Sequence, residues 1–215
     1  MVRDDVTGFV LAGGKSSRMG RDKAVLSLDG RTLLERALST VGEVVREVFI
    51  LGSKTLYGNF GKTIEDIYPG CGPLGGIHAA LTRLAEEKRE QTADARLALI
   101  IAVDTPFLTA EFLSFMVERA TQCGAVVTTP EIGGYRQPLC AVYSLEFLPI
   151  AEHALKSASA GTGKSREYKI VPLFPTGKTE VIGEAELKGF AFTPEMFENL
   201  NTPEDVARTR QRVGK

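Results

Sequence analysis

Residues 8–24 read Gly8-Phe-Val-Leu-Ala-Gly-Gly-Lys-Ser-Ser-Arg-Met-Gly-Arg-Asp-Lys-Ala24, which is the most informative part of this chain. Its apolar beginning is typical of a buried strand, and the strand runs into two adjacent glycines. Residues without side chains let backbone N–H groups approach an anion closely. Cations beside such a loop neutralise a polyanion such as a triphosphate. The stretch therefore predicts a nucleotide phosphate site, with four cations close to the glycines: Lys15, Arg18, Arg21 and Lys23.

Length and composition predict one soluble domain spanning residues 1–215. The chain is 43% hydrophobic and 25% charged, with a formal net charge of −1. This balance excludes a general affinity for nucleic acid or for anionic membranes, so a basic site must be local. Three cysteines without C-x-x-C spacing argue against a disulfide framework or a thiolate zinc site, and we expect them to be small buried hydrophobes. Because no signal-peptide pattern or long apolar run occurs, we expect a cytoplasmic protein.

Outside the opening stretch, strand-like and helix-like segments alternate. The run Leu97–Val103 is wholly apolar and predicts a fully buried strand. Strands that alternate with helices predict a three-layer, Rossmann-like α/β fold with a mostly parallel central sheet. Residues 176–189 are polar and give no clear pattern. Expected strands cover residues 6–12, 48–51, 62–65, 97–103, 125–129 and 139–143, and expected helices cover residues 32–45, 74–87, 110–120 and 145–156.

Two aspartates follow predicted strands. Asp104 stands where the apolar run 97–103 stops, and ligands of open parallel sheets bind outside the carboxyl ends of strands. A lone carboxylate there suits Mg²⁺, which usually takes one or two protein carboxylates plus substrate phosphates. A turn or helix-capping role before Thr105-Pro106 is an equally good interpretation. Asp66 precedes the glycine-rich turn 68–76, whose backbone amides either contact a base or ribose or simply lead into the next helix.

Two familiar phosphate motifs do not fit this chain. The G-x-G-x-x-G fingerprint is absent, because Gly13-Gly14-Lys15 has the wrong spacing. A relaxed phosphate-loop pattern occurs at 158–165, ending in Gly163-Lys164-Ser165. A true phosphate loop needs a strand before it and a helix after it, whereas here a helix is expected before it and a strand after it. A surface loop is the better interpretation of 158–165.

The stretch Leu11–Ala24 resembles the signature of molybdenum cofactor guanylyltransferases, which make molybdopterin guanine dinucleotide from GTP and a molybdenum-loaded pterin. Further stretches resemble the family's motifs in the same order: 65–66, 72–76, 103–107, 136–139 and 197–205. The resemblance spans nearly the whole chain and implies a nucleotidyltransferase fold. It also implies guanine as the base, since related cytidylyltransferases read Leu-Ala-Ala-Gly where this chain has Leu-Ala-Gly-Gly. The family often has Asn at the end of its second strand, where this chain reads Leu51-Gly52-Ser53.

The resemblance implies roles for individual residues. Asp104 would bind GTP and Mg²⁺, Asp66 would lie by the nucleoside, and Lys23 would bind the triphosphate with Arg18 beside it. Catalytic roles fall to Arg18, Lys23 and Asp104, and the GTP site comprises Leu11, Ala12, Gly13, Gly14, Lys23, Asp66, Gly72, Pro73, Leu74, Gly76 and Asp104. Candidates on the pterin side are Arg136, Gln137, Lys164, Arg166 and Asn201, although Asn201-Thr-Pro-Glu-Asp205 is also a good helix start.

The reaction implied is Mg²⁺-dependent transfer of GMP to the terminal phosphate of molybdopterin, with release of pyrophosphate. GTP and the pterin are the expected partners, with transient contacts to molybdoenzymes or other cofactor-biosynthesis proteins, and without nucleic acid or membrane. Three alternatives stay open from the residues alone. They are a cytidylyltransferase for the same pterin or a sugar-phosphate nucleotidyltransferase, a P-loop kinase or ATPase using Lys164 and Ser165, and a non-catalytic pterin carrier.

Overall fold

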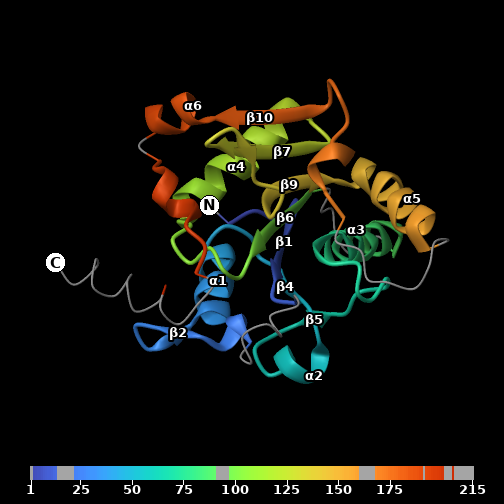
Figure 1. Cartoon of the computed structure of the whole chain (residues 1–215), viewed down its shortest axis with the longest axis horizontal. Coiled ribbons are helices and arrows are strands. Elements are labelled where there is room, and N and C mark those ends of the chain that lie inside the picture. The colour runs from blue at the N-terminus through green and yellow to red at the C-terminus, as the bar shows by residue number, and fades with distance from the viewer. Residues whose placement is uncertain are drawn as a thin grey trace.

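The computed structural model describes residues 2–13, 22–90, 97–159, 168–190, 192–200 and 205. Its centre is an eight-stranded sheet in the order β10-β7-β9-β6-β1-β4-β5, with β8 paired to β7 (Figure 1). A separate hairpin joins β2 to β3. The strands are β1 (Val6–Leu11), β2 (Ser27–Leu28), β3 (Arg31–Thr32), β4 (Val48–Leu51), β5 (Thr63–Ile64), β6 (Leu97–Ala102), β7 (Val127–Ile132), β8 (Tyr135–Arg136), β9 (Cys140–Ser144) and β10 (Thr179–Gly183).

One half of the sheet is parallel. Strands β6, β1, β4 and β5 run in the same direction, and β1 pairs with β6 on one side and with β4 on the other. The chain leaves β1 toward β4 and later returns to β6, so the connections diverge on either side of β1. Ligands of open α/β sheets bind at such a switch point, outside the carboxyl ends of the strands.

Helices cover both faces of the sheet. Helices α1 (Leu33–Gly42) and α4 (Ala110–Cys123) cover one face, and α3 (Pro73–Glu90) and α5 (Leu148–Ser159) cover the other (Figure 1). Each face has its own buried apolar cluster, because alternate side chains of a strand point to opposite faces. In β1, Val10 packs with the α1 and α4 side, and Phe9 packs with the α3 and α5 side. The three-layer, mostly parallel fold expected from the sequence is confirmed.

Most of the expected boundaries shift by a few residues, as α1 and β7 illustrate. Helix α1 begins as predicted, with Thr32 as its N-cap in a capping box with Glu35, but it ends at Gly42 and not at Val45. Val44 and Val45 are buried although they lie beyond the end of the helix. The apolar pattern in the sequence therefore extends further than the helical backbone. Strand β7 runs through Pro130, which still offers its carbonyl oxygen to the amide of Gln137 at 3.0 Å.

Several elements have no counterpart in the expected pattern. The segment 176–189 forms β10, which pairs in parallel with β7 at the sheet edge, and then α6 (Glu184–Gly189). The short helix α2 (Lys54–Tyr57) follows β4, and the 3-10 helix η2 (Lys23–Val25) precedes the hairpin. Cys140 is buried but Cys123 is exposed, so the expectation of buried cysteines is wrong for Cys123, which lies in the last turn of α4.

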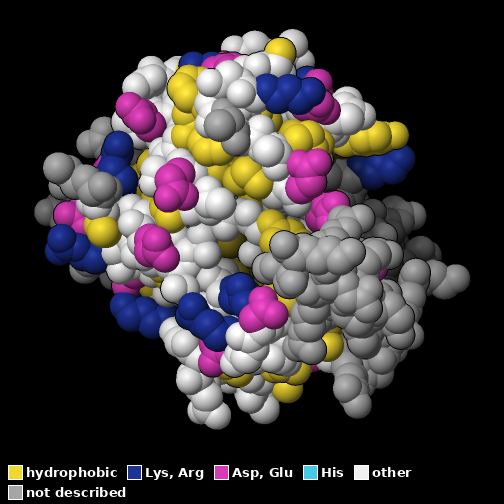
Figure 2. Space-filling model, turned by 90° about the vertical axis from the view of Figure 1, so that its left-hand side faces the viewer, with side chains coloured by type: hydrophobic (Ala, Val, Ile, Leu, Met, Phe, Trp, Pro, Cys, Tyr) yellow, Lys and Arg dark blue, Asp and Glu magenta, His cyan; other side chains and the backbone are white. Residues whose placement is uncertain are grey.

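The surface carries both signs of charge. On the side shown in Figure 2, acidic and basic side chains of the described residues are interspersed, with apolar patches between them. Within the described ranges, each helix is too short or too polar to cross a lipid bilayer.

Candidate active site

A cavity of about 480 Å³ opens at the carboxyl ends of three parallel strands. Leu11 and Gly13 come from the end of β1, residues 51–53 from the end of β4, and Glu65 and Asp66 from the end of β5. The turn that leads into α3 closes the other side with Pro69, Gly70 and Gly72. A cavity of this size fits a small organic ligand, and its place at the switch point is where the fold predicts a ligand.

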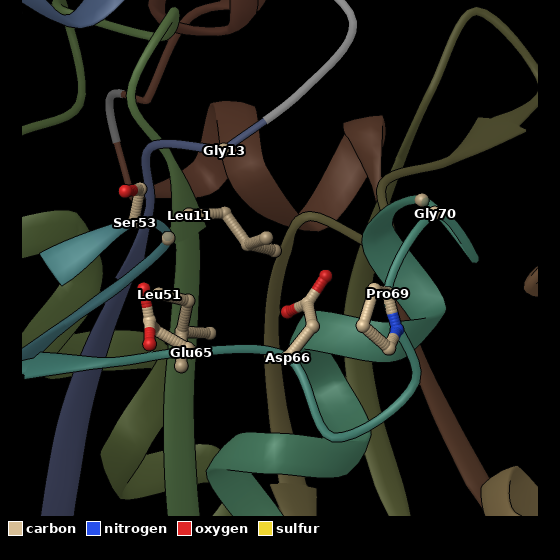
Figure 3. A pocket seen from close by; sticks show the side chains of 10 residues that line it. Leu11, Gly13, Leu51, Ser53, Glu65, Asp66, Pro69 and Gly70 are labelled. Carbon is tan, nitrogen blue, oxygen red and sulfur yellow. The ribbon is translucent and has the colours of Figure 1, made fainter. Parts of the chain in front are cut away.

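Asp66 is the acidic group at the centre of this cavity. Its carboxylate points into the space between Leu11 and Pro69 (Figure 3). Two glycines at the start of α3 make room for it: a Cβ on Gly75 would lie 3.2 Å from Asp66 Oδ2, and one on Gly76 would lie 2.7 Å from Leu11 Cδ2. The Gly72–Gly76 motif therefore lets the first turn of α3 approach the carboxylate and the end of β1.

Burial raises the pKa of the Asp66 carboxyl above its ordinary value. A half-buried carboxylate that faces a cavity in this way is an acceptor for donors on a ligand. Such donors are the hydroxyls of a ribose or the N–H groups of a base.

Lys23 and Asp104 form a second site, also at the carboxyl edge of the sheet. Asp104 follows β6 by two residues, and Lys23 begins η2. Lys23 Nζ lies 3.5 Å from Asp104 Oδ2, although 81 positions separate them in the sequence (104 − 23), and their side chains are 28% and 22% exposed. Strand β1 connects the two sites, because Leu11 lines the cavity and its carbonyl accepts the amide of Val103 at 3.0 Å.

The backbone around Asp104 is fixed from two directions. Thr105 donates its hydroxyl to the Ala102 carbonyl at 2.9 Å, which forms a turn directly after β6. The amide of Leu200 donates to the Asp104 carbonyl at 2.9 Å, and the Leu200 side chain is buried. The segment that precedes Asn201 therefore packs beside Asp104. The turn interpretation and the ligand interpretation of Asp104 are compatible, since these bonds use the Thr105 hydroxyl and backbone groups, while the Asp104 carboxylate pairs with Lys23.

The donor set at this edge suits a divalent cation that arrives with phosphates. No group of three or more His, Cys, Asp or Glu side chains gathers into a metal site in the part of the chain that the structure describes. A single carboxylate is compatible with Mg²⁺ that takes most of its ligands from substrate phosphates and water. Asp104 fits that role, whereas a permanently bound metal ion would need more protein ligands.

The other residues expected in the sites lie in different surroundings. Leu74 is fully buried in the α3 and α5 core, and Ala12 is also buried. On the proposed pterin side, Arg136 pairs with Glu131 at 3.7 Å, and Gln137 donates to the Tyr135 carbonyl at 2.9 Å. Neither residue lines the cavity. Seven residues expected in the phosphate, GTP or pterin sites fall outside the described residues: Gly14, Lys15, Arg18, Arg21, Lys164, Arg166 and Asn201.

His78 is a core residue. It is 4% exposed in α3, its ring meets Tyr68 edge-on with 5.0 Å between ring centroids, and its Nδ1 has no hydrogen-bond partner among the described residues. Burial lowers the pKa of His78, so the ring is neutral at physiological pH. Its contact with Tyr68 braces the cavity turn against α3. The imidazole is thus a structural group.

Sequence reasoning missed part of the cavity wall. The cavity is also lined by Gly52, Ser53 and Gly70. No motif marks these residues in the sequence, and only their positions, after β4 and in the turn before α3, connect them with the cavity. The segment Leu51–Ser53, where the family often has Asn, forms the cavity wall after β4. The signal that would have found these residues is the end of the strand, because every strand of the parallel half delivers its next residues to the same edge.

The fold and the two sites define a nucleotide-binding α/β domain. The chain belongs to the MobA-like NTP transferase domain family, whose model matches residues 8–168. It is 33% identical over 206 residues to a probable molybdenum cofactor guanylyltransferase of Pelotomaculum thermopropionicum, covering 95% of this chain and 91% of the relative. A protein of the same description from Carboxydothermus hydrogenoformans is 30% identical to this chain, and the match covers 95% of this chain and 94% of that relative.

The fold is also found in a solved structure. The crystal structure of molybdopterin-guanine dinucleotide biosynthesis protein A from Archaeoglobus fulgidus superposes with a TM-score of 0.77. The two sequences are 22% identical, and the superposition covers 97% of this chain and 98% of the Archaeoglobus chain. At that identity the likeness establishes the fold alone, while the sequence relatives establish the family.

Proposed function

We propose that this protein transfers GMP from GTP to the terminal phosphate of molybdopterin, forming molybdopterin guanine dinucleotide and pyrophosphate. The observation that carries the proposal is the pairing of a nucleoside-sized cavity around Asp66 with the Lys23–Asp104 site at the same sheet edge. Near full-length relatives at 30–33% identity are named probable molybdenum cofactor guanylyltransferases, which supports GTP and the pterin as substrates.

The chemistry is an in-line displacement at phosphorus. A terminal phosphate oxygen of the pterin forms a bond to the α-phosphorus of GTP, and the bond from that phosphorus to the bridging oxygen of the β-phosphate breaks. The oxygen is already anionic near pH 7, so no protein base has to remove a proton. The protein therefore acts by positioning and by neutralising charge. Lys23 neutralises the triphosphate and the leaving pyrophosphate, and Asp66 accepts hydrogen bonds from the nucleoside.

Asp104 would hold Mg²⁺ in this proposal. When bound, the ion would neutralise charge on the phosphate oxygens of GTP and of the leaving pyrophosphate. The proposed location is the cytoplasm, and transient contacts with molybdoenzymes or other cofactor-biosynthesis proteins stay predictions.

A pyrophosphate-release assay across the four NTPs tests the proposal. The purified protein is incubated with Mg²⁺ and each NTP, with and without molybdopterin, and the pterin product is identified by mass. We expect pyrophosphate only with GTP and molybdopterin together, in equal amounts with the dinucleotide.

Each competing function gives a different outcome in the same assay. Transfer from CTP identifies a pterin cytidylyltransferase, and pyrophosphate formed with a sugar phosphate but not the pterin identifies a sugar-phosphate enzyme. Release of inorganic phosphate with GDP or ADP as product identifies a kinase or ATPase. Pterin binding that is indifferent to GTP and Mg²⁺, with no pyrophosphate or dinucleotide formed, identifies a carrier. Each of these results contradicts guanylyl transfer.

Replacing Asp66 with asparagine should raise thermal stability while weakening GTP binding. The pKa of the Asp66 carboxyl is higher in the folded protein than in the unfolded chain. The free energy of unfolding therefore falls as the pH rises from the unfolded-state pKa through the folded-state pKa. At neutral pH the ionised carboxylate therefore destabilises the fold, and the neutral amide removes that cost. Each 1 kcal/mol of destabilisation that the substitution removes raises Tm by about 2–4 °C in a chain of this size. Loss of hydrogen bonds to a charged acceptor should weaken GTP binding by about 10- to 100-fold.

Calorimetric melting at pH 7 and titration with GTP measure both effects. Asp29→Asn is the matched control, because Asp29 is exposed on the β2–β3 turn and pairs with Arg36 at 3.2 Å. A lower Tm together with unchanged GTP binding in Asp66→Asn would contradict the role of Asp66.

A further inference from the structure

Tyr57 joins three segments at the base of the active site. It ends α2 and is 3% exposed. Its hydroxyl lies 2.6 Å from Asp22 Oδ2 and 3.2 Å from the carbonyl oxygen of Ala12. These partners are 35 and 45 positions away in the sequence. Ala12 follows β1 directly and Asp22 precedes η2, so one phenol connects the end of β1 to the helix that carries Lys23.

Asp22 uses its two carboxylate oxygens for different purposes. Oδ1 accepts the amide of Ala24 at 3.0 Å and caps η2, and Oδ2 accepts the Tyr57 hydroxyl. Lys23 is the next residue, and its Nζ is 3.5 Å from Asp104. A 3-10 helix of three residues has little stability of its own, so its orientation depends on its anchors. Buried Ala24 holds η2 against the apolar core, and the Tyr57 hydroxyl ties its N-cap to the end of β1.

The Tyr57 ring is held firmly enough to direct its hydroxyl. A Cβ on Gly52 would lie only 2.8 Å from Tyr57 Cε2, so the ring packs against backbone that carries no side chain. Gly52 itself lines the cavity and donates its amide to the Ile64 carbonyl at 2.9 Å. Burial and the Asp22 carboxylate raise the pKa of Tyr57, so the hydroxyl remains a donor at physiological pH. An O–H donor facing a carboxylate at this distance forms a strong, charge-assisted bond.

We propose that Tyr57 is a positioning residue for phosphate binding: its hydroxyl fixes Asp22 relative to the end of β1 and so holds Lys23 in place beside Asp104. The inference rests on the proposed function, because Lys23 is assigned there to the triphosphate. Tyr57 does not touch the phosphates in this proposal. Its effect passes through Asp22 and η2, and the ring contact with Gly52 couples it to the nucleoside cavity.

The substitution Tyr57→Phe tests the inference, because it removes the hydroxyl and keeps the ring packed against Gly52. We expect kcat for guanylyl transfer to fall about tenfold, with KM for the pterin unchanged. A double-mutant cycle with Lys23→Ala then identifies the route of the effect. If the hydroxyl acts through Lys23, adding Tyr57→Phe to Lys23→Ala costs less than twofold. A further tenfold loss in the double variant would overturn the inference.

Amide hydrogen exchange supplies a readout that does not need activity. The amides of Ala24, Val25 and Leu26 bond to Asp22 Oδ1 and to the carbonyls of Asp22 and Lys23. We expect these amides to exchange faster in Tyr57→Phe. The control is Tyr143→Phe, which removes another buried phenol hydroxyl, bonded to the Pro138 carbonyl at 2.7 Å, and should leave exchange over 24–26 unchanged.

The outcomes separate the two claims. A wild-type protein that releases no pyrophosphate with GTP and molybdopterin overturns the proposed function, while exchange still tests the link from Tyr57 to η2. An active wild-type protein whose Tyr57→Phe variant has an unchanged kcat, or unchanged exchange over 24–26, overturns the inference about Tyr57 and leaves guanylyl transfer standing.

Discussion

Replacing Asp104 with alanine is expected to lower the rate of guanylyl transfer by about 10²- to 10³-fold, the usual cost of losing one preorganised electrostatic contact. The proposed role of the carboxylate is to hold Mg²⁺ against the phosphates, and the described residues offer no metal site of three or more ligands as a substitute. We therefore also expect the variant to need a higher Mg²⁺ concentration for half-maximal rate. Steady-state pyrophosphate release over a range of Mg²⁺ concentrations measures both effects.

Loss of fold would not explain such a result. The structural bond at this position uses the Asp104 carbonyl, which accepts Leu200 whatever the side chain. The ion pair with Lys23 is partly exposed, and such pairs contribute about 0.2–1 kcal/mol to stability. The control Asp4→Ala removes another carboxylate, exposed and paired with Arg46 at 2.7 Å, and should keep wild-type activity. A cleanly folded Asp104→Ala variant with a wild-type rate would refute the role of Asp104.

Replacing Lys23 with alanine is expected to lower the same rate by about 10²- to 10³-fold. Charge on the phosphates increases toward the leaving pyrophosphate, so the ammonium group stabilises the transition state more than it stabilises bound GTP. The loss should therefore fall mainly on kcat, with a smaller rise in KM for GTP. Initial rates at varied GTP and saturating pterin separate the two parameters.

Two companion variants define what Lys23 contributes. Lys23→Arg keeps the charge but changes its shape and reach, so we expect it to restore only part of the rate. Lys178→Ala removes an exposed lysine that pairs with Glu146 at 2.9 Å, away from the cavity, and should behave as the wild type. Equal losses in Lys23→Ala and Lys178→Ala would indicate a general effect of net charge and would contradict a local role for Lys23.

Much of the fold could be predicted because its signals are local. The apolar run at β1 ends in glycines, and the run at β6 ends at Asp104, so each strand and its end are marked in consecutive residues. Helix α1 carries its own N-terminal signal in Thr32 and Glu35. Once the sheet is taken as parallel, the ends of β1 and β6 must meet at one edge. The proximity of Lys23 and Asp104 agrees with that expectation.

Local patterns in the sequence indicate the strands of the parallel half, and they assign Asp104 and a group of cations that includes Lys23 to the carboxyl ends of those strands. Long-range packing sets three further features: β9 runs antiparallel between β6 and β7, 179–183 adds a strand at the edge, and the Tyr57 hydroxyl reaches Ala12 and Asp22. The difference lies in the range of the interactions involved. Apolar periodicity and capping act within a few residues, whereas strand order and a hydrogen bond across 35 or 45 positions depend on how the completed chain packs.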